Sequence, residues 1–411
     1  SQQLKQTVGD IIARVEKEGD EAVLDYTRKF DCPDLTSLVL SQENIDALAA
    51  KVTPEVASAI DTAFNNIKMF HEAQMPSDIA LTTTPGVKCE LRFTALDAVG
   101  LYIPGGSAPL PSTVLMLGVP ALVAGCENKL LCTPPNKEQL IAPEIAYAAR
   151  KCGIDKIFLC GGAQAIAAMA LGTDSVPQVD KIFGPGNSFV TEAKQQVSQR
   201  ADGAAIDMPA GPSEVLVLAD EFANPEFVAA DLLSQAEHGP DSQAILVSNS
   251  ATLIEEAKAA VERQLATLSR AEIARPAMEN ARYILADSIE QAIEASNAYA
   301  AEHLIVQIEN ARDYLPKIKY AGSIFLGPWS PESAGDYASG TNHVLPTYGY
   351  AKNYSSLGLL DFMRRYTIQE LSADGMRNLG PAIMALAAAE GLDAHEQAVA
   401  LRMQALKQGD A

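Results

Sequence analysis

From residue 98 onwards the chain alternates short apolar runs with helical segments, and this alternation constrains the fold more than any other feature. The clearest runs span residues 99–103, 129–132, 156–160, 181–183, 215–218 and 244–247, and three more follow at 283–286, 304–308 and 323–326. Runs that are apolar throughout are typical of parallel strands covered by helices on both faces. The sequence therefore predicts an α/β fold built on parallel sheets.

The regions outside this alternation have a different pattern. Helical periodicity covers residues 4–29, 42–51 and 54–74, and the tail from about residue 357 is helical and rich in Ala and Leu, which predicts an appended helical domain. Residues 328–356 show no convincing period but hold several aromatic side chains. A loop of this length inside a compact protein is usually functional or disordered, and the aromatic content favours a functional loop.

Charge and cysteine content exclude several classes of protein. The 411 residues include 31 basic and 52 acidic ones, a net charge of −21, which argues against nucleic acid as a partner. No apolar run is long enough to cross a membrane. The six cysteines form no C-x-x-C pair, so we expect reduced thiols in a cytoplasmic protein. The chain starts at Ser1 in a helical pattern, which suggests missing N-terminal residues rather than a signal peptide.

The end of one helix is the first candidate for a metal site. Gly239-Pro240 is a helix stop signal, so Gln235 and His238 would project from one face of the last helical turn. Carbonyl groups at that end carry partial negative charge, which favours a bound cation. The simpler interpretation is a histidine that only caps the helix.

Two distant residues would extend this site. His395 falls in the first turn of the final helix, where the helix N-terminus keeps an imidazole neutral, the form that binds metals. Asp336 lies in the long loop beside a glycine. Together with Gln235 and His238, these residues would offer one amide oxygen, two imidazoles and one carboxylate, a donor set suited to Zn²⁺. His71 has no such setting and is interpreted as structural.

The adjacent pair Glu302-His303 is the candidate for acid–base chemistry. It lies where a helix gives way to the run at 304–308, and catalytic groups often collect at the ends of strands. A neighbouring carboxylate and imidazole suit proton abstraction and water activation near neutral pH. A polar pair that merely begins a strand is the alternative.

Glycine turns offer possible phosphate sites. No complete G-x-G-x-x-G occurs, but residues 102–106, 161–164 and 184–187 each form a glycine-bearing turn after an apolar run. Such turns can cradle phosphate at a helix N-terminus, although each alone is equally compatible with an ordinary tight turn. Cys160, which ends one run, could act as a nucleophile in aldehyde oxidation. A small buried residue is the simpler interpretation of this cysteine.

Six segments match the pattern of one known enzyme family. They span residues 101–109, 183–187, 205–214, 235–242, 330–343 and 390–395. The segments are long and specific, and the similarity runs from near residue 1 to the end of the chain. In these segments the chain resembles histidinol dehydrogenase in its bacterial, monofunctional form, with only the extreme N-terminus of the family absent.

The resemblance implies a zinc- and NAD-dependent oxidation of L-histidinol to L-histidine. The reaction would consume two NAD⁺, pass through the aldehyde and form the last two steps of histidine biosynthesis. His303 would act as general base and Glu302 would activate water. One Zn²⁺ per subunit would position the substrate, and its ligands would be Gln235, His238, Asp336 and His395.

The resemblance also implies the remaining contacts of the site. The substrate would contact His303 and the four metal ligands, and further contacts would come from Ser213, His343 and Glu390. The NAD contacts would be Tyr102, Gln164 and Asn187. The enzyme would be a homodimer with shared active sites, in which Glu390 and His395 come from the partner subunit. No cysteine nucleophile is implied.

For the fold, the resemblance implies two incomplete dinucleotide-fold (Rossmann-like) domains, one interrupted by the other. Residues 1–101 with 215–356 would form the first domain, and residues 102–214 the inserted domain on the NAD side. Residues 357–411 would form a helical domain that reaches the partner subunit.

Three alternative functions stay open. One is a relative that oxidises a different small alcohol, although the groups expected near the substrate imidazole, Glu390, His395 and His343, favour histidinol. A zinc hydrolase would use Glu302 on water without nicotinamide, and the glycine turns argue against it. A non-enzymatic metal-binding protein would leave the Glu302-His303 pair without a role.

Overall fold

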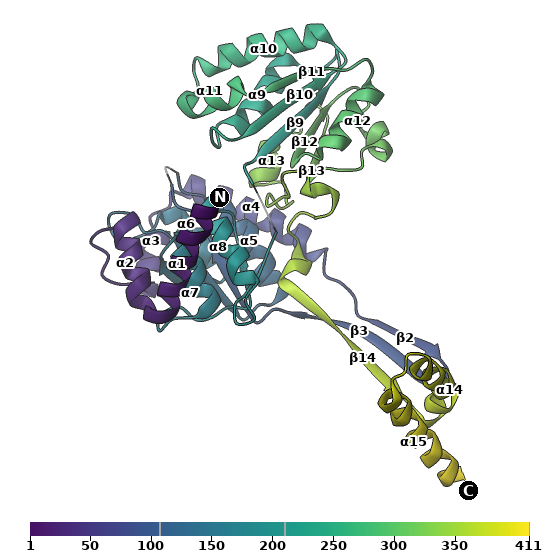
Figure 1. Ribbon diagram of the computed structural model, residues 1–411. Coiled ribbons are helices and arrows are strands. Elements are labelled where there is room, and N and C mark those ends of the chain that lie inside the picture. The colour runs from purple at the N-terminus through teal and green to yellow at the C-terminus, as the bar shows by residue number, and fades with distance from the viewer. Residues whose placement is uncertain (107, 209–210, 411) are drawn as a thin grey trace. The chain divides into compact units, whose positions relative to one another are not determined.

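The computed structural model describes residues 1–106, 108–208 and 211–410 (Figure 1). The chain divides into two compact units. The first comprises Ser1–Gln74 with Leu96–Phe362, and the second comprises Met75–Ala95 with Met363–Ala411.

Two sheets of the same topology form the framework of the first unit. Among the described residues, the first sheet has six strands in the order β1-β6-β5-β4-β7-β8 and the second has five in the order β11-β10-β9-β12-β13. The strands of the first sheet are β1 (Val39–Leu40), β4 (Ala98–Tyr102), β5 (Asn128–Thr133), β6 (Lys156–Leu159), β7 (Lys181–Phe183) and β8 (Ala205–Ile206). Those of the second are β9 (Glu214–Ala219), β10 (Gln243–Ser248), β11 (Arg282–Leu285), β12 (His303–Gln307) and β13 (Ser323–Leu326).

The order of the parallel strands identifies both sheets as doubly wound. Apart from β1, which pairs antiparallel with β6, the paired strands of both sheets run parallel. In each sheet the chain starts at a central strand, β4 or β9, moves to one side and then returns to the other. This order creates a switch point between β4 and β7 and another between β9 and β12, where such folds usually bind ligands. The expected α/β class with parallel sheets is confirmed.

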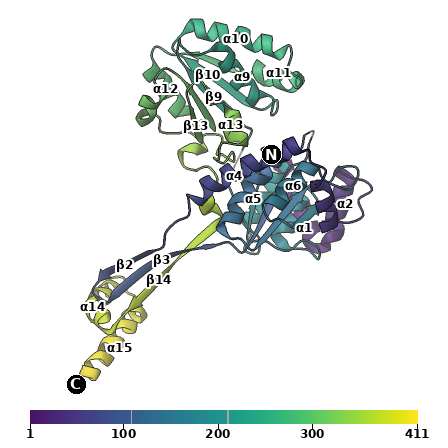
Figure 2. The ribbon, with the colours of Figure 1, turned by 180° about the vertical axis from the view of Figure 1, so that it is seen from behind.

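Helices cover both faces of each sheet (Figures 1 and 2). Those between the strands of the first sheet are α5 (Pro111–Ala124), α6 (Pro143–Lys151), α7 (Gly162–Leu171) and α8 (Ser188–Ser198). Those of the second are α9 (Pro225–Ala236), α10 (Ala251–Leu265), α11 (Ala271–Glu279) and α12 (Ile289–Tyr299). Along β9, Val215 and Val217 pack into one core cluster, and Leu216 and Leu218 into another. Because both faces are buried, the strands are apolar throughout rather than alternating.

The N-terminal helices pack differently from the expected domain division. They are α1 (Gln2–Glu18), α2 (Asp20–Phe30), α3 (Gln42–Ala49) and α4 (Pro54–Glu72). The single helix expected over 4–29 is broken at Gly19, whose φ of +59° favours glycine. Helices α1, α2 and α3 contact α6, α7 and α8, whereas the resemblance had grouped residues 1–101 with 215–356. The apolar face of α1 accounts for this packing, since it needs a neighbouring helix to cover it.

The second unit contains a sheet that the helical tail did not predict. Strands β14 (Met363–Leu371), β3 (Val87–Ala95) and β2 (Ile79–Thr84) pair antiparallel in that order. Helices α14 (Ala373–Ala389) and α15 (Asp393–Asp410) pack against each other. The expected helical domain of residues 357–411 therefore begins with a strand and includes residues 75–95. Such long-range pairing leaves no local signal in the sequence, because the partner strand lies far away along the chain.

The long segment of residues 328–356 contains short helical turns. They are α13 (Glu332–Tyr337) and the 3₁₀ turn η2 (Tyr350–Lys352), and two further 3₁₀ turns are η1 (Ala311–Lys317) and η3 (Leu359–Phe362). Helix α13 is too short to show a helical period in the sequence.

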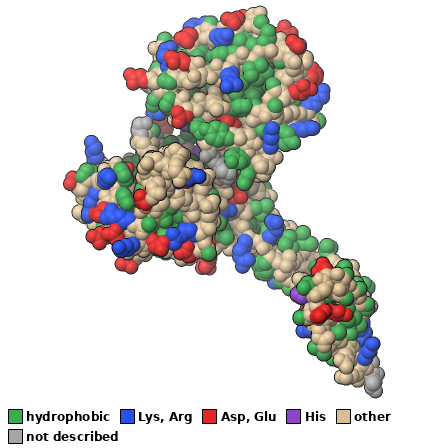
Figure 3. Space-filling view, viewed as in Figure 1, with side chains coloured by type: hydrophobic (Ala, Val, Ile, Leu, Met, Phe, Trp, Pro, Cys, Tyr) green, Lys and Arg blue, Asp and Glu red, His purple; other side chains and the backbone are tan. Residues whose placement is uncertain are grey.

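On the face seen in Figure 3, acidic and basic side chains are interspersed. Among the described residues, no helix is both long and apolar enough to cross a membrane.

A buried carboxyl group joins α9 to the second sheet. The Nε2 atom of Gln307 on β12 donates to Oδ2 of Asp231 on α9 at 2.7 Å, and the Oε1 atom of Gln307 is buried without a partner. Burial raises the pKa of Asp231 from its usual 3.8 to about 7.

We predict that Asp231→Asn stabilises the protein above pH 7. The folded carboxyl group holds its proton to higher pH than the unfolded one, so stability falls as pH rises from about 4 to about 7 and stays reduced above that. Removing the charge should raise the free energy of unfolding at pH 8 by roughly 1–3 kcal/mol. Denaturant unfolding at pH 5 and pH 8 measures this, with the exposed Asp155→Asn as control. If Asp231→Asn changed the free energy of unfolding equally at pH 5 and pH 8, the prediction would be contradicted.

Candidate active site

A cavity of about 390 Å³ gathers most of the predicted site residues of the first unit. Its lining includes Ser213, Gln235, His238, Glu302, His303, Asp336 and His343. It lies at the amino ends of β9 and β12 and beside the turn that follows β7, at residues 184–186. The Glu302-His303 pair thus lies at the start of a strand of the second sheet and faces the carboxyl edge of the first sheet. Catalytic groups in doubly wound folds more often follow the carboxyl ends of strands.

His303 is held in one orientation by the backbone of the neighbouring strand. It is the first residue of β12 and pairs in register with Val215 of β9. Its Nδ1 lies 3.1 Å from the carbonyl oxygen of Glu214, to which the Nδ1–H donates. In the neutral imidazole this bond leaves the lone pair on Nε2. That Nε2 atom is buried and makes no hydrogen bond with the described residues, so it is the atom that would accept a proton whenever the ring is neutral.

Three carboxyl groups of the described residues surround this imidazole. Oε1 of Glu332 lies 3.0 Å and Oε1 of Glu302 3.2 Å from Nδ1, and Oδ1 of Asp336 lies 3.4 Å from Nε2. Burial alone would lower the pKa of His303, but the attraction of Glu332, Asp336 and Glu302 outweighs it and raises the pKa to about 10. The same contact holds the pKa of Asp336 below its usual value, although burial opposes this.

Glu302 has the environment of a buried acid–base group. Burial is the main cause that raises its pKa to about 8, and the positive charge of His303 partly offsets it. Its backbone N–H donates to Oε1 of Glu214 at 3.0 Å, and Oε2 of Glu214 accepts from Tyr299 at 3.1 Å. Glu214, which sequence reasoning did not assign, therefore fixes the peptide between Ala301 and Glu302 through its side chain and His303 through its backbone.

The candidate metal ligands come together from α9 and α13. Helix α9 ends at Ala236, so His238 lies just beyond it rather than in its last turn as expected. The N–H of His238 still donates to the carbonyl of Gln235 at 3.1 Å, which keeps the two residues together. A ligand atom from each of His238, Glu332 and Asp336 can be chosen so that all lie within 4.8 Å of one another, close enough to hold one ion.

The side chain of Gln235 is buried in a way that would not be expected if His238 only capped the helix. Both Oε1 and Nε2 of its side chain are buried without a hydrogen-bond partner among the described residues. An unpaired buried amide costs about 1–3 kcal/mol, so such a group usually has a ligand or a functional role. The residues present therefore fit a metal ion.

Glu332 is the residue of this cluster that sequence reasoning missed. Its side chain is fully buried, Oε2 accepts from the hydroxyl of Ser234 at 3.4 Å, and burial raises its pKa. The signal was available in part, since Glu332 and Asp336 are four residues apart and share one face of a helical turn. The spacing carries little weight in the sequence, because α13 is too short to show a helical period.

The other expected substrate contacts fall into two groups. Nδ1 of His343 lies 2.9 Å from the carbonyl oxygen of Asp336, and burial lowers the pKa of His343. Ser213 lines the same cavity immediately before β9. Glu390 and His395 belong to the second unit, where Glu390 follows α14, His395 lies in the first turn of α15 and both are exposed. His71 is buried, with Nδ1 2.7 Å from the carbonyl oxygen of Ile67, in keeping with a structural role.

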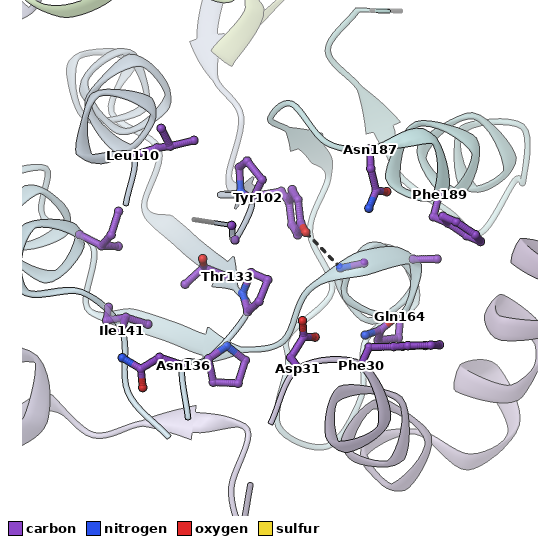
Figure 4. A pocket seen from close by; sticks show the side chains of 18 of the residues that line it. Phe30, Asp31, Tyr102, Leu110, Thr133, Asn136, Ile141, Gln164, Asn187 and Phe189 are labelled. Atoms are coloured by element: carbon purple, nitrogen blue, oxygen red, sulfur yellow. Dashed lines mark hydrogen bonds between the residues drawn. The ribbon is translucent and has the colours of Figure 1, made fainter. Parts of the chain in front are cut away.

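A larger cavity of about 840 Å³ contains the three expected NAD contacts, Tyr102, Gln164 and Asn187 (Figure 4). It lies at the switch point between β4 and β7, since Tyr102 ends β4 and residues 184–187 follow β7. The hydroxyl of Tyr102 accepts from the N–H of Gly162 at 3.0 Å, and Oδ1 of Asn187 accepts from Val190 at the start of α8 at 3.1 Å.

The first turn of α7 offers this cavity a place for phosphate. No side chain caps the helix at Gly161, so backbone N–H groups of its first turn can bind an anion. A Cβ atom at Gly161 would lie 2.3 Å from Cγ of Pro134, which explains the glycine. The residues present therefore fit a dinucleotide.

The second sheet has its own switch point, between β9 and β12. There the side chain of Asp220 accepts hydrogen bonds from backbone N–H groups that could otherwise bind a phosphate. Asp220 accepts from the N–H of Glu309 at 2.8 Å and from the N–H of Phe222 at 3.0 Å. A phosphate at this point would meet a negative charge and find these two donors occupied. The two sheets share a topology, but among the described residues an uncapped α-helix start lies at the switch point of the first sheet alone.

Cys160 is fully buried at the end of β6. The structure describes all six cysteines as free thiols. The neighbouring Cys132 lies close to Cys160, and its interaction with that thiol, together with burial, raises the pKa of Cys132. These surroundings favour the structural interpretation over a nucleophile, because a catalytic thiol needs a stabilised, accessible thiolate.

Two of the matching segments, 101–109 and 205–214, include residues 107 and 209–210, which lie outside the described residues.

Comparisons with known proteins agree with this site. The sequence model of a family described as histidinol dehydrogenase matches residues 1–403. Histidinol dehydrogenase of Idiomarina loihiensis is 57% identical over 404 residues, covering 98% of this chain and 91% of the relative. That of Escherichia coli K12 is 57% identical over 408 residues, covering 99% and 93%. A crystal structure of histidinol dehydrogenase from Elizabethkingia anophelis, 50% identical, superimposes with a TM-score of 0.95 and covers 98% of this chain and 93% of that one. The chain therefore belongs to the histidinol dehydrogenase family.

Proposed function

We propose that this chain performs its family's reaction, the oxidation of L-histidinol to L-histidine by two NAD⁺ with uptake of one water, at the end of histidine biosynthesis. One observation carries the proposal. The candidate metal ligands and the Glu302-His303 pair line one cavity, and that cavity shares Pro104 and Leu110 with the cavity that fits a dinucleotide. Substrate and cofactor can therefore meet at this boundary.

The residues that would hold the metal are Gln235, His238 and Asp336, with His395 of the partner subunit as the fourth ligand. When bound, Zn²⁺ would hold the imidazole and amine of the substrate in place, and NAD⁺ would accept hydride. Glu332 lies within reach of the same ion, but its Oε1 atom is 3.0 Å from His303, so we assign it to the imidazole. Homodimerisation and cytoplasmic location belong to the same proposal.

His303 would act as the general base through Nε2. The Nδ1–H bond to the carbonyl of Glu214 fixes the tautomer, and Nε2 is unpartnered. The raised pKa of His303 reflects Asp336 among other neighbours. A cation held by Asp336 would neutralise part of the negative charge that raises the pKa of His303, and this would favour the neutral ring that can take the hydroxyl proton.

Glu302 would serve the second half of the reaction. After the first hydride transfer the substrate is an aldehyde, which must take up water before a second hydride can leave. The carboxyl group of Glu302 lies beside His303, and burial brings its pKa to about 8. A carboxyl group with a pKa near the working pH can accept a proton from the attacking water and pass it on.

We predict that the zinc-loaded protein forms two NADH per histidinol, measured by absorbance at 340 nm. We also predict that His303→Asn lowers turnover by roughly 10²–10⁴-fold. Metal analysis of His303→Asn should show that zinc stays bound. A wild-type protein without NADH formation would contradict the proposed reaction. Zinc loss from His303→Asn would instead contradict the assignment of His303 as a base rather than a ligand.

We predict that Gln235→Met has opposite effects on stability and on metal binding. The substitution removes two unpaired buried polar atoms, so the metal-free protein should gain about 1–3 kcal/mol in free energy of unfolding. Zinc affinity should fall by roughly 10²-fold or more, because a ligand is lost. Denaturant unfolding and zinc competition titrations measure the two effects. The exposed Gln195→Met should change neither, and unchanged zinc affinity in Gln235→Met would rule this residue out as a ligand.

We predict that two inactive variants restore activity when they form a mixed dimer. If His395 of the partner subunit completes each site, His395→Ala and His303→Ala chains together produce one site in which both residues are present. Verified heterodimers should show up to about half the wild-type activity per dimer, since one of the two sites is intact. Heterodimers without activity would show that His303 and His395 act within the same chain.

A further inference from the structure

The dinucleotide cavity has a defined orientation if the proposed function holds. Pro104 and Leu110 line both this cavity and the cavity around His303, so the reacting nicotinamide must lie at that boundary. The adenosine half then extends away from it. Figure 4 shows Leu110 on one side of the cavity, with Asp31 and Phe30 on the opposite side. Asp31 therefore lies at the end that would receive adenosine.

Asp31 is the one charged side chain among the described residues that line this cavity, and no Lys or Arg is among them. Its carboxylate forms no side-chain hydrogen bond or ion pair with any described residue, and burial raises its pKa. A carboxylate without a partner in a partly dry cavity is a cost to the free protein, and the cavity itself offers no cation to offset that cost.

The position of Asp31 on its helix adds to this cost. It follows α2 directly as the C-cap, where its N–H donates to the carbonyl of Thr27. Helix C-termini carry partial negative charge, so they favour basic residues and disfavour acidic ones. The preceding turn follows the rule with Arg28 and Lys29. Neither helix stability nor packing accounts for an acidic residue here, which points to a ligand.

We propose that Asp31 binds the ribose hydroxyl groups of the adenosine half of NAD and excludes dinucleotides with a 2′-phosphate. A carboxylate can accept hydrogen bonds from two neighbouring hydroxyl groups, as acidic residues do at the ribose in other dinucleotide folds. A 2′-phosphate would bring a second negative charge against Asp31, in a cavity that no described Lys or Arg lines. Asp31 is thus a specificity-determining residue, distinct from the residues that perform the chemistry.

The test compares Asp31→Asn with the wild type and with Asp34→Asn, an exposed neighbour. Dissociation constants of NADH and NADPH are measured on the zinc-loaded protein by fluorescence titration, and those of ADP-ribose and 2′-phospho-ADP-ribose by calorimetry. In Asp31→Asn, NADH and ADP-ribose should bind about 10-fold or more weakly, because hydrogen bonds from the ribose hydroxyl groups to a carboxylate are stronger than those to a neutral amide. The 2′-phosphorylated ligands should bind no more weakly, so the preference for NADH over NADPH falls.

Stability provides a second readout. Asp31→Asn should leave the melting temperature of the ligand-free protein unchanged or raised, because it removes an unpaired charge at a helix C-terminus. Asp34→Asn should alter neither preference nor affinity. A preference for NADH that is the same in Asp31→Asn and wild type would overturn the inference while leaving the proposed function intact. A wild-type protein that binds neither NADH nor ADP-ribose would overturn the proposed function itself.

Discussion

The close approach of three carboxyl groups to one buried imidazole is the constraint around which the described part of the site is built. Glu302, Glu332 and Asp336 all lie within 3.4 Å of His303, and bringing several negative charges into a buried space is costly unless positive charge accompanies them. One imidazolium offsets part of that charge. A dication at Asp336 would offset more and would also free His303 to act as a base, so the electrostatics of the chain fit the metal that its family resemblance implies.

The fold creates this arrangement by combining opposite edges of two sheets with the same topology. The first sheet contributes its carboxyl edge, with the glycine turns and the uncapped start of α7. The second contributes its amino edge, where β9 and β12 bring the backbone of Glu214 next to His303. At its own carboxyl edge, Asp220 occupies two backbone donors at the switch point. Two similar sheets therefore have different tasks, one suited to the dinucleotide and the other to the catalytic pair.

Local chemistry was predictable from the sequence, and long-range geometry was not. The strands that are apolar throughout and the Gln235-x-x-His238 spacing could be recognised because they are properties of neighbouring residues. The pairing of β3 with β14 could not, since it joins segments far apart along the chain. Glu332 was missed because α13 is a single short turn. The residues themselves indicated that the Glu302-His303 pair suits acid–base chemistry, and the separate role of each came from the resemblance. The bond that fixes the His303 tautomer is visible only in the register of β9 and β12.

The central claim is that a metal ion belongs beside His303 but not on it. Diffraction data collected on either side of the zinc absorption edge, from crystals of the zinc-loaded protein, test this most directly. The account predicts one anomalous peak per site, bonded to Gln235, His238 and Asp336, with Nε2 of His303 outside the coordination sphere. A peak bonded to His303, or one remote from Gln235, would contradict it.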